Sequence, residues 1–391
     1  MGKLHKWKVL SFIYIFMLVF AVIFQGLPPV FGFIISSLGI SHAQAGALMS
    51  FFGLPGIFIS IPGGILSDIY GSRRVGITSL IIALAGSLMV GFGNNFAILV
   101  IGRIISGIGA LTIAIVAPQV LSKIFDKKDM GIAMGVFNTA MPLGTILTLN
   151  TFGLLAAATN WRIPLLLTSA YCFIILILFL FKYNDISGVN SKQDKTSFKE
   201  SLYEAKKIGW PIWLIAIIWM MYNASSISYL AFGSDYYVSI GYDTSYAGFL
   251  TSLLMIGALI FSTFVGYLTD KFGNEEYFIL GGSIGLAIAL LLVPRGGINP
   301  LVLGGLIGLS VSFVPSPVFS LVPKYLPREQ VGLGYGILST CLNIGVLIGP
   351  FLVGLFYDKT KSYASGFILM SALALLTGVF AILLKRVGKR F

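Results

Sequence analysis

The sequence predicts an all-α membrane protein of twelve transmembrane helices, and three observations lead to that class. Of its 391 residues, 57% are hydrophobic and only 10% are charged, whereas soluble domains carry about 25% charged residues. Runs free of Asp, Glu, Lys and Arg recur along the chain, near the length of about 20 apolar residues that crosses a bilayer. The positive charges gather in alternate connections between those runs. This composition disfavours a soluble enzyme, a disordered chain and, despite a net charge of +12, a nucleic-acid-binding protein.

The charge-free runs place six helices on each side of a polar stretch. The predicted spans are 9–34, 45–67, 75–93, 97–121, 131–158 and 163–181, then 209–232, 246–268, 277–293, 299–320, 332–356 and 364–384. Residues 1–182 and 209–391 are therefore predicted to form two six-helix bundles. The first span is too long for the apolar part of a signal peptide and has no small-residue cleavage site, so we expect it to be retained.

The polar stretch at 183–208 is predicted to be a cytoplasmic linker. Ser197 and Glu200 have capping-box spacing, and Phe198, Leu202 and Ala205 follow on one helical face among lysines. This pattern predicts a short amphipathic helix on the membrane surface. A solvated linker helix is the alternative.

The distribution of basic residues predicts the orientation. With the N-terminus inside, cytoplasmic segments hold 21 of the 26 Lys and Arg, outer loops hold four, and Arg103 lies within a span. Cytoplasmic loops are enriched in Lys and Arg. We therefore expect a multi-pass protein of the cell membrane with both termini in the cytoplasm.

The two halves repeat in the same orientation. Gly64-x-x-x-Asp68-x-x-Gly71 recurs as Gly266-x-x-x-Asp270-x-x-Gly273, 202 positions later. A second set of matches, 201 positions apart, pairs Gly131 with Gly332, Gly135 with Gly336, and Thr139 with Thr340. Two sets of matches at nearly one offset predict pseudo-symmetric bundles.

The stretch from Gly63 to Arg74, GGILSDIYGSRR, resembles the signature loop between helices two and three of the major facilitator transporters. Two six-helix halves repeated in parallel are also the organisation of that family. The resemblance implies the major facilitator fold, alternating access, and a substrate site near midplane between the halves. The chain departs from the family pattern at Ile69 and Ser72, where the family usually has basic residues, and at Glu275 and Glu276 in the second copy.

The repeated motif predicts a gate at the cytoplasmic side. A carboxylate at a helix end can accept hydrogen bonds from the N-terminus of a facing helix, and glycine lets that helix approach closely. The basic residues after the motif can compete for the carboxylate, which makes a latch that holds in one conformation only. The predicted gating residues are Gly64, Asp68, Gly71, Arg73, Arg74, Gly266, Asp270 and Gly273.

Arg103 is the basic residue within a predicted span, about 9 Å from the span's outer end. The stretch that it begins, RIISGIG, resembles the helix-four motif of the family. A charge at this depth is costly and faces a cavity or a partner rather than lipid. Two interpretations stay open: Arg103 contacts the substrate, or it hydrogen-bonds helix carbonyls and braces the first bundle.

Polar residues within the spans suggest a binding site, since the cavity helices of the family carry several of them. The predicted substrate-binding residues are Arg103, Gln25, Tyr222, Asn223 and Asn343. Hydrogen bonding between helices is the alternative role for each. Pro28-Pro29 and Pro315-x-Pro317 are expected to break helices one and ten.

The positions of the acidic residues, histidines and cysteines limit the chemistry that the protein can perform. No acid lies in the middle of a predicted span, and Asp235, at the outer mouth, comes nearest. Ser41 is expected to cap helix two, and His42 to be an exposed loop residue. Cys172 and Cys341 are interpreted as small core side chains. Because no metal-ligand spacing and no nucleophile with a base occur, we expect no cofactor, no metal and no enzyme activity.

Together these features predict a secondary transporter that moves a small solute, an organic or inorganic anion, across the cytoplasmic membrane by alternating access. Residues 137–144 resemble cyanate- and nitrate-type permeases, and the helix-five signature of proton-coupled drug exporters, Gly-Pro-x-x-Gly-Gly, is absent. An exporter of amphipathic compounds or drugs, or a receptor or scaffold on a transporter fold, is the alternative. The expected partners are a small-molecule substrate and membrane lipids, with no nucleic acid, and the protein is expected to be a monomer.

Overall fold

Twelve long apolar helices run through the molecule, which confirms the predicted fold class. The computed structural model describes residues 3–59, 70–182, 208–327 and 330–388. Within these ranges twelve helical segments are long and apolar enough to cross a membrane, and no residue lies in a strand. The predicted linker helix after Ser197 and the motif residues Gly64 and Asp68 lie outside the described residues. The domain limits at residues 182 and 209 stay a prediction.

The first bundle contains the first six spans. They are α1 (Lys3–Gln25) continued by a 3-10 turn η1 (Pro28–Val30) and α2 (Phe31–Leu38), α3 (His42–Ile59), α5 (Ser72–Phe92), α6 (Phe96–Ile124), α7 (Lys127–Asn138) with α8 (Ala140–Ala158), and α9 (Arg162–Lys182). The predicted break at Pro28-Pro29 is confirmed, because α1 ends just before these prolines and a 3-10 turn replaces it.

The second bundle repeats this organisation. Its helices are α11 (Trp210–Ser239), α12 (Thr244–Phe272), α13 (Glu275–Leu292) with a 3-10 turn η2 (Val293–Arg295), α14 (Pro300–Ser312) with α15 (Pro315–Tyr325), α16 (Val331–Thr360) and α17 (Tyr363–Gly388). The predicted break at Pro315-x-Pro317 falls between α14 and α15. Helix α12 carries Gly266 and Asp270 of the second motif copy, and α3, which precedes the first copy in the sequence, begins 202 positions before α12, at the offset of the repeat.

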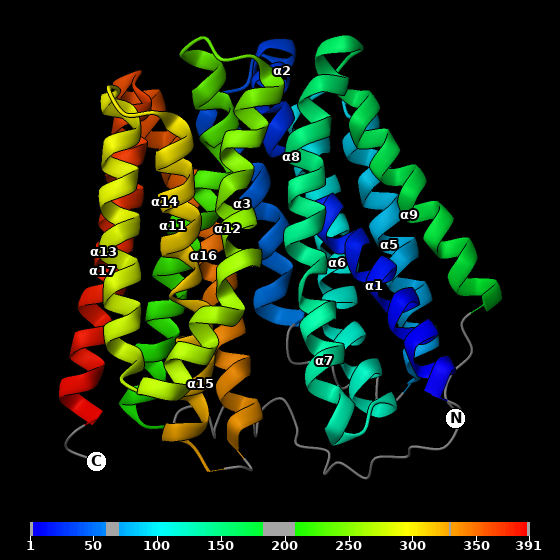
Figure 1. Cartoon of the computed structure of the whole chain (residues 1–391). Coiled ribbons are helices and arrows are strands. Elements are labelled where there is room, and N and C mark those ends of the chain that lie inside the picture. The colour runs from blue at the N-terminus through cyan, green and yellow to red at the C-terminus, as the bar shows by residue number, and fades with distance from the viewer. Residues whose placement is uncertain (1–2, 60–69, 183–207, 328–329, 389–391) are drawn as a thin grey trace.

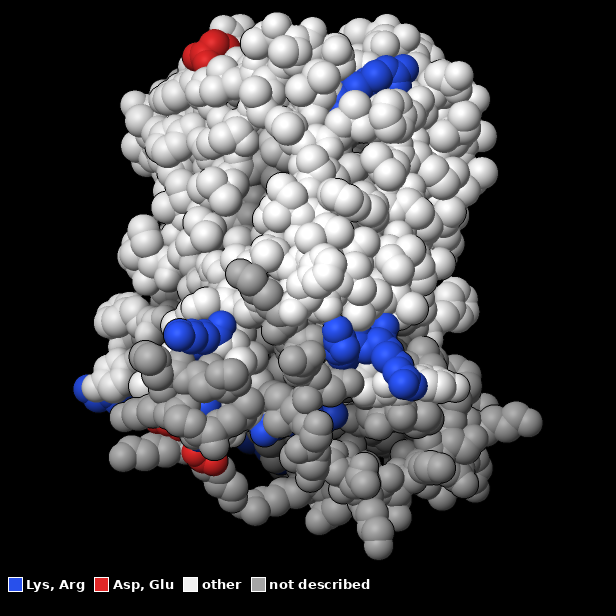
Figure 2. Space-filling model, turned by 90° about the vertical axis from the view of Figure 1, so that its right-hand side faces the viewer, with Lys and Arg blue, Asp and Glu red and all other residues white. Residues whose placement is uncertain are grey.

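The two bundles stand side by side, with both chain termini at the same end (Figure 1). We call this the terminal end and the opposite one, where α2 lies, the distal end. Figure 2 shows most of the Lys and Arg of one face toward the terminal end and a broad belt without charge above them, with further basic and acidic atoms only at the distal end. Such a belt is what a membrane-embedded surface requires, since a charge facing hydrocarbon is costly.

Glycines bring the bundles into close contact along two seams. A Cβ on Gly46 of α3 would lie 2.2 Å from the carbonyl oxygen of Pro350 in α16. A Cβ on Gly248 of α12 would lie 1.9 Å from the carbonyl oxygen of Leu149 in α8. No other residue fits at these crossings, and close backbone approach through small residues is how membrane helices associate. The seams α3–α16 and α8–α12 therefore hold the bundles together in this conformation.

Candidate functional site

The distal end of α3 is capped by a residue of the other bundle. Ser41 and Gln44 form a capping box: Ser41 Oγ accepts from the backbone N–H of Gln44 at 3.2 Å, and Gln44 Oε1 accepts from that of Ser41 at 2.9 Å. The predicted cap is thus confirmed. The next two backbone N–H groups, of His42 and Ala43, donate to the two carboxylate oxygens of Asp358 in α16, at 3.1 and 2.8 Å. The N-terminus of α3, which belongs to the first bundle, is therefore capped by a carboxylate of the second bundle.

The expectation that His42 is an exposed loop residue is wrong. It is the first residue of α3, and its side chain is only 16% exposed. Imidazole Nε2 lies 3.4 Å from Asp235 Oδ2 and 3.3 Å from the Tyr363 hydroxyl, while Nδ1 lies 3.7 Å from Asp358 Oδ1. The Tyr363 hydroxyl donates a hydrogen bond to Asp235, and the Tyr357 ring packs on the imidazole with 3.8 Å between centroids. The sequence could not show these contacts, because the partners come from three helices far along the chain.

We refer to His42, Asp235, Asp358 and Tyr363 as the distal cluster. Its members come from α3, α11, α16 and α17, so it joins one helix of the first bundle to three of the second. One signal could have found it: the positive-inside pattern puts all four residues on the same side of the membrane, although that side has few titratable groups. Asp235, predicted at the outer mouth after helix seven, lies within the last turns of α11, which runs to Ser239.

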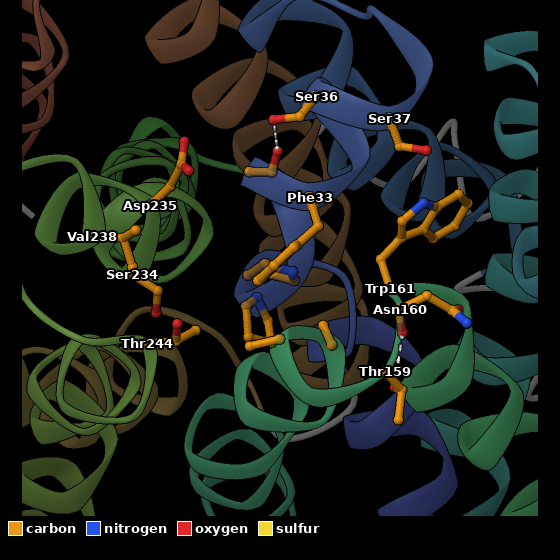
Figure 3. Close-up of a pocket in the computed structure, with 15 residues that line it drawn as sticks. Phe33, Ser36, Ser37, Thr159, Asn160, Trp161, Ser234, Asp235, Val238 and Thr244 are labelled. Atoms are coloured by element: carbon orange, nitrogen blue, oxygen red, sulfur yellow. Dashed lines mark hydrogen bonds between the residues drawn. The ribbon is translucent and has the colours of Figure 1, made fainter.

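A cavity of about 670 Å³ opens beside the distal cluster, between the two bundles. Figure 3 shows Phe33, Ser37 and Trp161 of the first bundle across from Ser234, Asp235 and Thr244 of the second. Asp235 is the one charged residue among those that line this cavity. The carboxylate thus belongs both to the inter-bundle contact and to a space that solvent can enter.

Arg103 lies inside the first bundle and is 2% exposed. Its guanidinium donates to the carbonyls of Leu48 (3.0 Å), Ile23 (2.8 Å) and Phe24 (3.3 Å), and it sits 4.4 Å from the centroid of the Phe52 ring. These contacts agree with the interpretation in which Arg103 hydrogen-bonds helix carbonyls and braces the first bundle. They do not support the prediction that Arg103 binds substrate directly, since the acceptors all belong to α1 and α3.

The other predicted substrate-binding residues are buried, and the structure does not bring them into one cluster of contacts. Tyr222 donates to the carbonyl of Val311 at 3.2 Å, Asn223 to that of Trp219 at 2.7 Å, and Asn343 to that of Ser339 at 2.9 Å. These bonds stay within the second bundle. Gln25 differs, because both polar atoms of its amide are buried and have no hydrogen-bond partner in the described part of the chain.

The described gating residues lie at the terminal end. Gly71 and Gly273 precede α5 and α13 and take positive φ angles of 84° and 62°, so both copies of the motif end on a turn that favours glycine. Arg73 donates to the carbonyl of Leu180 at 2.8 Å, within the first bundle. Arg74 and Asp270 are exposed, and Gly266 faces Ser316 of its own bundle.

Two ion pairs between described residues at the terminal end also stay within one bundle each. Lys6 pairs with Asp126 at 2.5 Å, and Lys324 with Glu275 at 2.5 Å. The hydrogen bond and charge of Lys6 lower the pKa of Asp126, which lies in the connection before α7. The inter-bundle ion contacts among the described residues are those of His42 at the distal end.

Twelve membrane-crossing helices in two repeated bundles, joined by glycine seams and a polar contact at one end, define a polytopic membrane transporter. The family model of the Major Facilitator Superfamily matches residues 12–241 and again residues 214–390. The chain therefore belongs to the Major Facilitator Superfamily. It is a transporter and not an enzyme, as predicted.

Relatives and a solved structure match over most of the chain. An uncharacterized transporter of this type from Methanocaldococcus jannaschii is 26% identical over 92% of this chain and 93% of its own length. The human lysosomal dipeptide transporter MFSD1 is 24% identical (80% and 71%), and the probable sulfoacetate transporter SauU of Cupriavidus necator is 23% identical (86% and 84%). The crystal structure of the nucleoside transporter NupG superposes with a TM-score of 0.76 at 13% identity, covering 96% of this chain and 97% of that one. The resemblance to cyanate- and nitrate-type permeases stays a prediction.

Proposed function

We propose that this chain carries a small anion with a carboxylate or another oxyanion group across the cell membrane by alternating access. One observation carries the proposal: the buried charge of Arg103 has only neutral partners, namely helix carbonyls, the Met49 sulfur at 3.6 Å and an aromatic ring. A charge in a low-dielectric interior acts over a longer range than one in water. Arg103 therefore favours a negative solute without contacting it.

The distribution of acidic residues also favours a solute of negative charge. The described Asp and Glu of the spans and their connections all lie at helix ends: Asp126, Asp129, Asp235, Asp243, Asp270, Glu275, Glu276 and Asp358. No carboxylate of the described residues compensates Arg103 in the middle of the bundles. A cationic solute would meet uncompensated positive charge there.

The relatives support a carboxylate in the solute. Sulfoacetate carries a carboxylate and a sulfonate, and a dipeptide carries a terminal carboxylate. The two solutes differ in size and in the presence of an amino group. The carboxylate is the group that they share, and it is the only feature that we propose for the solute of this chain.

Gln25 is the side chain we propose as a direct solute contact. A buried amide without partners costs free energy unless something occupies its hydrogen-bonding positions, and its two N–H groups can donate to an oxyanion. Tyr222, Asn223 and Asn343 stay predicted contacts that would have to exchange their present backbone acceptors for the solute.

The conformation described is closed at the distal end, and the charge pattern makes that end extracellular in our proposal. Near the terminal end, Gly131, Gly135 and Gly332 have nothing within 4 Å of a Cβ position. We propose that these repeated glycines pack across the bundles in the opposite state, together with the gating residues.

Uptake into liposomes by the purified protein tests this proposal. Radiolabelled sulfoacetate is the probe, and unlabelled acetate, a dipeptide and the lipophilic cation tetraphenylphosphonium are the competitors. We expect acetate and the zwitterionic dipeptide, which both carry a carboxylate, to compete, and the cation not to compete. Competition by the cation alone would overturn the anion proposal.

Two Gln25 variants of similar size test the contact. Gln25→Leu removes the donors and is expected to raise the KM for the anion about tenfold, since each hydrogen bond to a charged group contributes about 1.5–3 kcal/mol. Gln25→Glu adds a negative charge and should reduce uptake further. Equal uptake by Gln25→Glu and the unmodified protein would exclude Gln25 from the solute site.

A further inference from the structure

We propose that His42 is a proton-binding site, and that a proton bound there strengthens the closure of the distal end. This proposal concerns a coupling or regulatory ion rather than the solute. It goes beyond the anion proposal and does not depend on it.

The geometry places one imidazole between two carboxylates of the other bundle. Asp235 lies 3.4 Å from Nε2, and Asp358 lies 3.7 Å from Nδ1. A neutral imidazole has a single N–H, so it can donate to one carboxylate only and turns a lone pair toward the other. An imidazolium donates from both nitrogens. The closed arrangement therefore has a place for one more proton than a neutral histidine supplies.

The surroundings of His42 reinforce a positive charge on it. Besides the two carboxylates, α16 contributes the Tyr357 ring, whose centroid lies 3.8 Å from that of the imidazole at a tilt of 37°. From α17, the Tyr363 hydroxyl donates to Asp235 and keeps that oxygen turned toward the imidazole. The cations on the elements that pack on α3 include Lys359 of α16, which follows Asp358 and is exposed, and Arg103 of α6, which binds the carbonyl of Leu48, six residues beyond His42.

Proton binding is linked to the conformational change because the partners belong to different bundles. When the distal end opens, His42 moves with α3 and both carboxylates move with the second bundle. The imidazolium then loses both acceptors, so the open state binds the proton more weakly. By linkage, a proton must favour the closed state by the same factor. Histidine is the side chain whose charge changes between pH 5 and 8.

Asp358 stabilises the closed distal end even without the proton, because its carboxylate accepts hydrogen bonds from the backbone N–H groups at the start of α3. The proton adds a second attachment to this cap. Asp235, which lines the distal cavity, provides the route by which a proton from solution can reach the imidazole.

The two histidines of the chain provide a matched control. His5 lies at the start of α1 at the terminal end, so His5→Gln replaces the chain's other histidine and leaves the distal cluster unchanged. In a background without Cys172 and Cys341, both buried, spin labels at the exposed residues Ser37 and Ile240 report the distance across the distal end by double electron–electron resonance. The sample is the full chain in lipid nanodiscs at pH 5.5 and pH 8.5.

We expect the ratio of closed to open molecules to fall about tenfold from pH 5.5 to pH 8.5, the effect of one charge-assisted hydrogen bond. His5→Gln should show the same change, and His42→Gln should show almost none. An unchanged ratio in the original protein, or the original pH dependence in His42→Gln, would overturn the proposal.

A second variant keeps the test decisive if His42→Gln does not fold. Asp235→Asn has the same shape but offers the imidazolium a neutral acceptor, so it should lose most of the pH-dependent change. An Asp235→Asn protein with the full change would also overturn the proposal. Neither readout requires a transported solute, so failure here is distinguishable from failure of the anion proposal.

Discussion

At the scale of the residue, the guanidinium of Arg103 fastens three helices of the first bundle. It reaches from α6 to carbonyls of α1 and α3 and packs on the Phe52 ring. A planar fork of donors suits several acceptors at once, and an ammonium group does not replace it. Its depth in a span made it a functional candidate in the sequence, but depth alone does not say which way a side chain points. Only the positions of the carbonyls on two other helices decide that.

We therefore expect Arg103→Gln to lower stability by about 2–4 kcal/mol, because charged donors are lost and buried carbonyls are left with poorer partners. Arg103→Lys should lose much of the same amount. Arg162→Gln is the control, since Arg162 also donates to backbone carbonyls, those of Gly91 and Gly93, but is only partly buried; it should cost less, about 1 kcal/mol. Thermal unfolding in detergent measures the three. An Arg103→Gln protein of unchanged stability that no longer binds anions would restore the direct-contact interpretation.

At the scale of the element, the seam between α3 and α16 sets how closely the bundles approach. It runs from Gly354, whose Cβ position lies 2.2 Å from the His42 carbonyl oxygen, through Gly46 to Gly56, which faces Asn343. Gly46 and Gly56 are ten residues apart, about 15 Å along α3. Glycines at these crossings are the condition for the polar contacts at the distal end, because a Cβ would move the helices apart.

Gly46→Ala should shift the equilibrium toward an open distal end. Its Cβ would meet backbone atoms of Pro350, which cannot yield as a flexible side chain would, and overpacking costs about 1–3 kcal/mol. We expect the closed population, measured with the labels at Ser37 and Ile240, to fall about tenfold or more. Gly281→Ala in α13 has nothing within 4 Å and should leave the distances unchanged. A Gly46→Ala protein as closed as its parent would show that the seam is not limiting.

The elements were predictable where composition alone decides them. Charge-free runs located the twelve spans, since length and apolarity are sufficient to define a membrane helix. The same rule failed at the end of helix seven. It predicted an end at residue 232, because it ends a span before the first acidic residue. Helix α11 continues to Ser239 since His42 and Tyr363 provide partners for Asp235. Contacts between bundles cannot be found from one segment at a time.

At the scale of the whole molecule, the asymmetry of charge predicts how the protein lies in the membrane. Most of the basic residues on the face in Figure 2 lie toward the terminal end, and cytoplasmic segments are enriched in Lys and Arg. On this prediction the distal cluster faces the outside, and the proton proposed to close the distal end would come from the external medium. Acidification outside and not inside is expected to change the closed population.

This orientation can be measured on intact cells with single cysteines in the background lacking Cys172 and Cys341. Arg386→Cys places a thiol in the last turn of α17 at the terminal end, and Ile240→Cys places one at the distal end; both positions are exposed. A membrane-impermeant maleimide should label Ile240→Cys on intact cells and Arg386→Cys only after permeabilisation. The reverse pattern would put the distal cluster in the cytoplasm. The proton site would then respond to internal pH, while the linkage between His42 and distal closure, which depends only on which bundle holds each partner, would be unchanged.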